Sequence, residues 1–176
     1  SSSVLRAVDL AFYSAVAAVV WYWLRADGMG HGGRAWVVLM LFLFYFSISE
    51  WCHCQRDMWL LLPALAALML RRRQIEAWGS ERRAWSLARW ALLEGMFWGA
   101  GVWVKPMIIF PALGCWLMSV VQLRWRQSRL ADLGGLLVGG ATIGGAGLVW
   151  MDASGAWPYF FTTLREWNPD YVRGKE

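Results

Sequence analysis

The chain has 176 residues, of which 59% are hydrophobic and 16% are charged, and its mean hydropathy is +0.39. Soluble domains are about 45–50% apolar and about 25% charged, so this composition excludes a disordered chain and points away from a soluble domain. The net charge of +5 falls in short runs between long apolar blocks, which argues against nucleic-acid binding. The sequence therefore predicts a multi-spanning membrane protein.

Six apolar segments are long enough, with their flanking residues, to form membrane-spanning helices of about 20 residues. In chain order they are residues 7–24, 35–50, 58–70, 91–104, 107–122 and 133–150. No alternating strand pattern competes with them, and an open sheet edge is not stable in lipid. We predict an all-α, polytopic transmembrane helix bundle that forms a single region over residues 1–176, with an outer-face tail at 151–176.

The fourth and fifth segments are joined only by Lys105 and Pro106. Because proline cannot donate a backbone hydrogen bond, a helix must bend or end at this point. The pair is either a tight helical hairpin or a broken helix, and the sequence leaves both arrangements open.

Lysine and arginine residues are distributed unevenly along the chain. Eleven of the 17 lie in three connecting segments, which are residues 25–34, 71–90 and 123–132. Cytoplasmic loops carry the excess of Lys and Arg, so we place these three segments in the cytoplasm. The start of the chain, the turns at 50–57 and 105–106 and the tail at 151–176 then share the outer face.

Glycines recur at four-residue spacing in two of the segments. They are Gly95 and Gly99 in the fourth segment, and Gly135, Gly139, Gly140 and Gly144 in the sixth. Small residues at this spacing allow two helix backbones to approach closely. We expect them to pack helices within one chain, and a dimer interface is the alternative.

A polar run, EWCHCQRD, separates the second and third segments at residues 50–57. Charges this close to a membrane boundary are costly unless they are paired, solvated or facing a cavity, so Glu50, Arg56 and Asp57 are candidate site residues. The alternative is a solvated turn in which Arg56 pairs with one of the two acids.

Cys52, His53 and Cys54 lie within this polar run and raise the question of a metal site. Zinc-binding cysteine pairs normally have about two to four residues between them, and the other histidine of the chain is the distant His31. We therefore predict an ordinary interfacial cluster without a metal.

Lys105 is a further candidate, because a short loop would place its ammonium at the outer mouth of the bundle, where it suits a phosphate. A lysine that extends to the lipid headgroups is the alternative.

In the tail, Asn168 and Asp170 lie between aromatic residues whose faces suit sugar rings, whereas residues 157–161 suit anchoring at headgroups. Glu94, within an apolar segment, is either functional or a packed, partnered acid.

Several motifs of soluble enzymes are absent from the sequence. It has no phosphate-binding glycine loop with Lys-Ser/Thr, no His-Glu-x-x-His and no Gly-x-Ser-x-Gly. An enzyme of this composition would therefore take a lipid-borne substrate from the bilayer. The chain begins with three serines and lacks the features of a signal peptide, so we expect it to be an internal fragment of a longer protein.

Three stretches carry a resemblance to a known family. They are the run from Glu50 to Asp57 with the Pro-containing segment that follows it, the stretch from Glu94 to Pro106, and Trp167-Asn168-Pro169-Asp170-Tyr171. Together they resemble the middle of bacterial integral-membrane glycosyltransferases of the GT-C type. Those enzymes are relatives of the dolichyl-phosphate-mannose protein mannosyltransferases and of the aminoarabinose lipid A transferases.

The resemblance implies transfer of a hexose or pentose from a polyprenyl-phosphate donor to an acceptor at the outer face, in a bacterial cytoplasmic membrane. It implies that Arg56 and Lys105 hold the donor phosphate and that Asp57 and Glu50 are secondary catalytic acids. The main catalytic carboxylate would lie upstream of Ser1. A divalent cation is used by some of these enzymes and not by others, so the cofactor stays open, as do the donor sugar and the acceptor.

In the same interpretation, Asn168 and Asp170 contribute to substrate binding. Two other classes compete with the transferase: a transporter or flippase of lipid-linked intermediates, and a non-catalytic membrane scaffold. A transporter predicts broken helices in matching positions of two halves. The sequence has one broken-looking pair of segments, at residues 105–106, and no second copy, which weighs against a transporter. A scaffold predicts that the outer-face polar residues tolerate substitution.

Overall fold

The computed structural model of the protein describes residues 2–47, 56–77, 84–121, 126–162 and 165. These residues contain helices and turns and no strand, so the all-α prediction is confirmed for them. The elements are α1 (Ser2–Ala26), α2 (His31–Ser47), α3 (Arg56–Ala77), α4 (Ala84–Val104), the 3₁₀ helix η2 (Pro106–Ile108), α5 (Ile109–Val120), α6 (Arg126–Ala153) and the short α7 (Trp157–Thr162).

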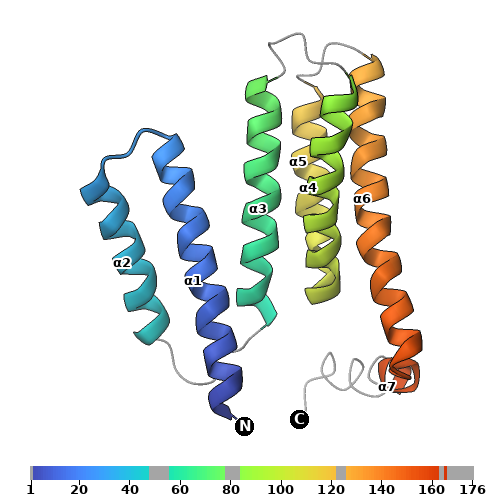
Figure 1. Ribbon diagram of the computed structural model, residues 1–176, viewed down its shortest axis with the longest axis horizontal. Helices are drawn as coiled ribbons and strands as arrows, with labels where there is room; N and C mark the ends of the chain where they lie inside the picture. The colour runs from blue at the N-terminus through green and yellow to red at the C-terminus, as the bar shows by residue number, and fades with distance from the viewer. Residues whose placement is uncertain (1, 48–55, 78–83, 122–125, 163–164, 166–176) are drawn as a thin grey trace, which may run out of the picture.

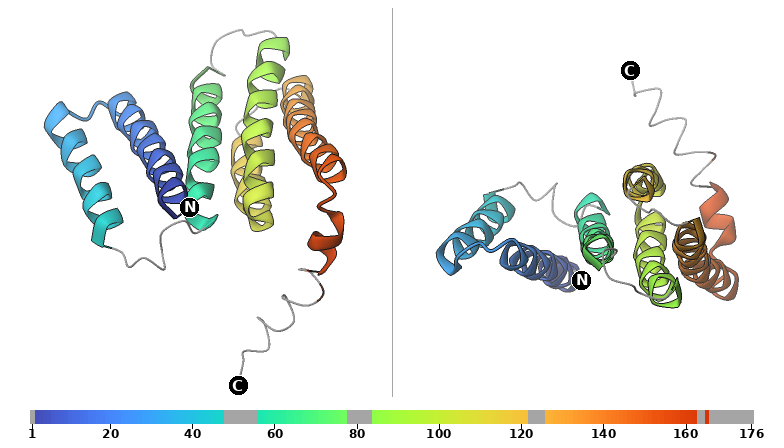
Figure 2. Two further views of the ribbon diagram at one scale, coloured as in Figure 1. Left: turned by 60° about the horizontal axis from the view of Figure 1, so that its bottom comes forward. Right: turned by 90° about the horizontal axis from the view of Figure 1, so that it is seen from above.

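The long helices run alternately up and down, side by side (Figure 1). Seen from above, α2, α1, α3, α4 and α6 form a curved row, with α5 to one side of α4 (Figure 2). The start of α1, the end of α2, the start of α3 and the ends of α4 and α6 lie at one end of the bundle, called here the lower end. The starts of α4 and α6 lie at the opposite, upper end, together with the connection between α1 and α2.

The helices cover most of each predicted apolar segment and extend beyond several of them. Residues 48–50 of the second segment and residue 122 of the fifth lie outside the described residues. The largest differences are at residues 71–90, which the sequence treats as a connection. α3 continues from Leu70 to Ala77, and α4 begins at Ala84. Polar side chains at the end of α3, those of Arg71 and Gln74, are buried in the bundle, which hydropathy alone does not anticipate.

The link between α4 and α5 is a tight hairpin. Lys105 is extended, with φ −154° and ψ 110°, and residues Pro106–Ile108 make one 3₁₀ turn before α5 begins. A Cβ on Gly101 would lie 2.6 Å from Cδ1 of Ile108, so the glycine lets this side chain pack closely where the chain folds back. α5 then runs upward beside α4 (Figure 1), which selects the hairpin over the broken helix.

Glycines set the close approach of α4 and α6, the most extensive helix contact in the described residues. A Cβ on Gly95 would collide with the carbonyl oxygen of Leu136, and a Cβ on Gly139 would collide with that of Leu92. The prediction that the glycines pack helices within one chain is confirmed for this pair. Gly144 has no atom within 4 Å of its Cβ position, so it does not take part.

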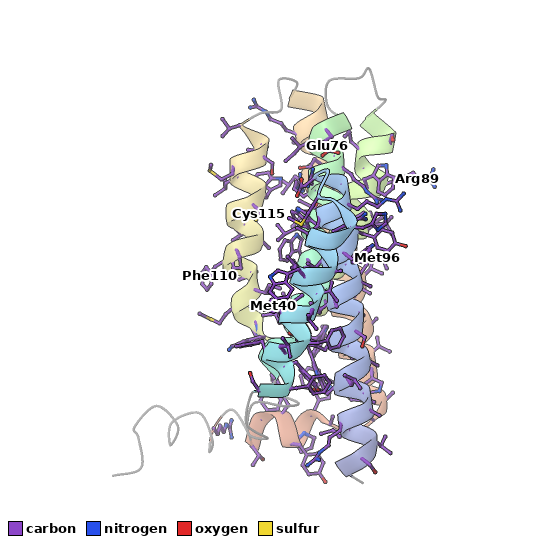
Figure 3. The ribbon with its side chains drawn as sticks, turned by 90° about the vertical axis from the view of Figure 1, so that its left-hand side faces the viewer. Met40, Glu76, Arg89, Met96, Phe110 and Cys115 are labelled. Carbon is purple, nitrogen blue, oxygen red and sulfur yellow. The ribbon has the colours of Figure 1, made fainter. Side chains whose placement is uncertain are left out.

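The interior of the described bundle holds polar side chains beside a small hydrophobic core, and much of its surface is apolar. The largest fully buried side chains are Gln74, Glu94, Asp132 and Ser119. Large apolar side chains are exposed on α2, α5 and α6, including Phe44, Phe46, Phe110, Leu117, Met118, Leu137 and Val149. Phe110 points away from the helices in Figure 3. Soluble monomers rarely expose large contiguous apolar areas, whereas polar side chains of membrane bundles face inward.

Two helices are long and apolar enough to cross a membrane, judged by length and composition. They are the stretches Ser3–Ala26 and Arg129–Ala153. The apolar helices His31–Ser47 and Pro106–Val120 are shorter. The described residues therefore support two candidate spans, and the six-span bundle stays a prediction.

Candidate functional site

Three of the six predicted site residues lie in the described part of the chain. Arg56 and Asp57 form the first turn of α3, where the structure describes their backbone but not their side chains. Lys105 follows the last residue of α4, and its side chain is exposed. The other residues that the sequence singled out in these regions lie outside the described residues: Glu50, Cys52, His53, Cys54, Asn168 and Asp170.

The start of α3 and the end of α4 lie side by side at the lower end (Figure 1). The two helices touch near Leu60 and Gly101, where the Leu60 Cδ1 atom is 3.5 Å from the Cβ position of the glycine. Arg56 is one turn before Leu60, and Lys105 is one turn after Gly101. Since each helical residue rises 1.5 Å, both lie about 6 Å beyond this contact, toward the lower end.

The backbone of Lys105 is held on both sides. Its N–H donates to the carbonyl of Gly101 at 2.8 Å, and its carbonyl accepts from the N–H of Ile108 at 3.1 Å. The turn is therefore fixed, and it places the exposed Lys105 at the end of the bundle. Such a cation can bind an anionic oxygen as a point charge.

A buried carboxylate at the same end was not among the site residues predicted from the sequence. Asp9 on α1 is 2% exposed, and its Oδ2 accepts a hydrogen bond from the Tyr45 hydroxyl of α2 at 2.8 Å. Its Oδ1 accepts from Nε1 of Trp59 on α3, also at 2.8 Å. We call Asp9, Tyr45 and Trp59 the Asp9 cluster.

The Asp9 cluster positions the first turn of α3. Trp59 comes three residues after Arg56, so its bond to Asp9 holds α1 against the turn that carries Arg56 and Asp57. Tyr13, one turn after Asp9, donates from its hydroxyl to the carbonyl of Leu41 at 2.7 Å and adds a second link between α1 and α2. The sequence signal for this cluster is an acid inside an apolar segment, which normally faces the bundle interior.

A second buried polar group joins α3, α4 and α6 nearer the upper end. Arg71 donates from Nε to Oε1 of Glu94 at 3.0 Å, and its Nη2 lies 2.9 Å from Oε2 of that residue. Its Nη1 donates to both oxygens of Asp132, at 3.0 and 2.9 Å. One guanidinium thus faces two carboxylates, and all three side chains are at most 4% exposed.

Neutral donors complete this group, which we call the Arg71 cluster: Arg71, Gln74, Glu94, Trp98, Trp116 and Asp132. Gln74 Nε2 donates to Glu94 Oε2 at 2.8 Å, and Trp98 Nε1 donates to Glu94 Oε1 at 3.0 Å. Trp116 of α5 donates to Asp132 Oδ2 at 3.1 Å. Buried charges persist when they are paired and hydrogen-bonded. Two atoms of the cluster, Arg71 Nη2 and Gln74 Oε1, are buried without a hydrogen-bond partner among the described residues. These contacts match the alternative that Glu94 is a packed, partnered acid.

Arginines at the upper end are also engaged with neighbouring side chains. Arg72 bonds Glu76 at 2.8 Å and pairs with Asp27 at 2.5 Å. The buried Arg34 lies 4.8 Å from the ring centroid of Trp21. Among the described residues, and with the buried Arg34 and Arg71 set aside, the upper end still holds more Lys and Arg residues than the lower end.

Among the described side chains, no group of three or more His, Cys, Asp or Glu residues is placed to hold a metal ion. Comparison with family models, curated proteins and solved structures finds no match to the chain. The interpretation of the lower end therefore rests on its own residues and their placement.

Proposed function

We propose that the chain is part of a multi-pass membrane glycosyltransferase of the GT-C type. In this proposal α1 to α6 cross a bacterial cytoplasmic membrane, with the basic upper end in the cytoplasm and the lower end outside. The apolar side chains exposed along the helices and the polar side chains buried between them support a membrane environment. The enzyme transfers a sugar from a polyprenyl-phosphate donor to an acceptor at the lower end.

The observation that carries the proposal is the placement of Arg56, Asp57 and Lys105 at adjacent helix ends. Two cations and an acid are there brought to one end by antiparallel helices. A polyprenyl chain would lie among the apolar side chains, and its phosphate would meet the cations at the boundary. Phosphate oxygens form their strongest hydrogen bonds with charged donors of this kind.

The proposed reaction is an inverting displacement. A carboxylate outside this chain removes the proton of the acceptor hydroxyl, and the resulting oxygen attacks the anomeric carbon of the sugar. The bond from that carbon to the donor phosphate oxygen breaks, and the polyprenyl phosphate leaves with the negative charge. Lys105 and Arg56 offset this charge as it develops, which stabilises the transition state. Asp57 and Glu50 assist as secondary acids, and Asn168 and Asp170 contact the substrate.

The short helix α7 fits the same placement. Its Trp157 and Phe161 rings stack with centroids 5.8 Å apart, and Tyr159 is 78% exposed. Aromatic side chains gather where the hydrocarbon meets the lipid headgroups. In the proposal α7 lies at this outer boundary, next to the end of α6.

A transporter or flippase of lipid-linked intermediates is the second candidate, and the Arg71 cluster favours it. Ionisable side chains inside a membrane bundle often mark a transport pathway. However, every oxygen of Glu94 and Asp132 accepts a hydrogen bond from the protein, which suits a fixed connection between helices better than a site that must exchange ligands.

The test is the Lys105→Ala substitution in the full-length protein, with Arg73→Ala as the matched control, because Arg73 is an exposed cation at the opposite end of α3. We expect binding of a radiolabelled polyprenyl phosphate in detergent to weaken at least tenfold, because a charge-assisted contact to phosphate is lost. Sugar transfer from polyprenyl-phosphate donors should fall in parallel, and the control should match wild type. Normal binding and turnover in folded K105A protein would remove Lys105 from the mechanism.

A further inference from the structure

A groove of about 290 Å³ lies between α4 and α6 near the upper end. Its walls are small and aliphatic side chains, including Ala88 and Leu92 of α4 and Ala131 and Val138 of α6. Arg89 is a cationic residue on its border. The groove is on the outer surface of the helix pair, far along the bundle from Lys105.

Two neighbouring glycines explain why the space exists. A Cβ on Gly135 would lie 2.5 Å from the carbonyl oxygen of Ala88, so this glycine is needed for the contact between α4 and α6. A Cβ on Gly134 would meet no atom within 4 Å, although the residue lines the groove. Gly134 therefore keeps the groove open without contributing to helix packing.

Arg89 is placed to hold an anion at the groove. Its side chain is exposed and extends outward from α4 (Figure 3). Within the described residues it has neither an ion pair nor a hydrogen bond from its side chain. Arg89 comes five residues after the start of α4, about 7 Å along the helix, a depth from which a long cationic side chain reaches the headgroups.

We propose that this groove binds an anionic phospholipid, with an acyl chain on the small residues of α4 and α6 and the headgroup phosphate on Arg89. A guanidinium binds phosphate with two parallel hydrogen bonds, and basic residues at the cytoplasmic ends of membrane helices attract anionic headgroups. The apolar walls favour a lipid over free phosphate, which would contact Arg89 alone. The proposal rests on the membrane placement given above, and not on the transfer reaction at the lower end.

Native mass spectrometry of the full-length protein in detergent tests the proposal, with phosphatidylglycerol and phosphatidylcholine as the probes. We expect phosphatidylglycerol to bind at least five times more tightly. Arg89→Gln should reduce this preference to near parity, whereas Arg73→Gln, which removes an exposed cation at the same end outside the groove, should preserve it. Equal preference in wild-type and R89Q protein would overturn the proposal.

Gly134→Leu tests the apolar part of the site. The leucine side chain would fill the groove without entering the helix contact, so binding of both lipids should fall at least fivefold while the thermal unfolding midpoint stays close to that of wild type. Unchanged lipid binding in folded G134L protein would contradict the proposal, as would displacement of the lipid by soluble glycerol phosphate at similar concentration. If G134L does not fold, the comparison of R89Q with R73Q still tests whether the groove binds an anionic lipid.

The two proposals fail separately. K105A should leave the phosphatidylglycerol preference unchanged, because Lys105 lies at the opposite end of α4. If polyprenyl phosphate does not bind and the Arg89 dependence remains, the transferase proposal falls and the lipid site stands. If polyprenyl phosphate binds and the Arg89 dependence is absent, the lipid site falls and the transferase proposal stands.

Discussion

The Asp9 cluster joins three helices and the Arg71 cluster joins four, and the two do so by different chemistry. In the Asp9 cluster one carboxylate accepts hydrogen bonds from a neutral hydroxyl and a neutral indole. In the Arg71 cluster a guanidinium faces two carboxylates. Loss of a neutral donor costs one hydrogen bond, whereas loss of the arginine would leave two buried charges without their cation. The α3–α4–α6 half of the bundle should therefore be both the more firmly held and the more sensitive to single substitutions.

Arg71→Met should give the largest effect. Glu94 and Asp132 would stay buried without their cation, so we expect a loss of about 3–5 kcal/mol in the free energy of unfolding. Thermal or denaturant unfolding in detergent measures it. Arg73→Met removes an exposed arginine two residues along α3 and should change stability little. A loss below about 1 kcal/mol for R71M would mean that the cluster does not hold the helices as described.

Gly139→Ala should come next, because its Cβ would collide with the Leu92 carbonyl in the contact between α4 and α6. Overpacking of this kind costs about 1–3 kcal/mol. Gly144→Ala, five residues along the same helix, is the matched control, since its Cβ meets no atom within 4 Å. Unfolding of both variants under the same conditions gives the comparison, and equal stability would show that α4 and α6 separate easily.

Asp9→Asn should give the smallest of the three effects. The amide keeps one acceptor oxygen and loses the other, so one of the bonds from Tyr45 and Trp59 is lost, at a cost of about 1 kcal/mol. Tyr45→Phe removes one of the same bonds and should cost a similar amount. If D9N were as damaging as R71M, the contrast between a cluster with neutral donors and a cluster with a cationic donor would be wrong.

Much of the fold could be predicted from the sequence because its signals are local. Apolar runs predict helices, and the glycine spacing on two of them predicts a close contact, which Gly95 and Gly139 provide. Pro106 indicates an interruption, but the sequence does not choose between a broken helix and the hairpin, in which Ile108 packs against Gly101. Because successive spanning helices alternate in direction, the sequence places Arg56 and Lys105 at the same end of the bundle. The structure has the start of α3 and the end of α4 at one end.

The buried polar clusters could not be predicted in the same way, because their partners are far apart in the chain. Arg71 stands in a run of three arginines that reads as a charged loop, and its role depends on Asp132, 61 residues later. Asp9 depends on Tyr45 and Trp59, which follow 36 and 50 residues after it. A single sequence gives no signal for such pairings, whereas Glu94 is conspicuous because its own segment is apolar.

The Arg71 cluster also implies an order of assembly if the chain is inserted into a bilayer during synthesis. Arg71 leaves the ribosome 23 residues before Glu94 and 61 residues before Asp132. Until both acids have followed, its cation is stable only near water, since an unpaired charge within lipid is costly. The upper part of α3 would therefore wait at the membrane boundary and move to its final depth when α6 arrives, which makes the sixth helix the step that completes the bundle.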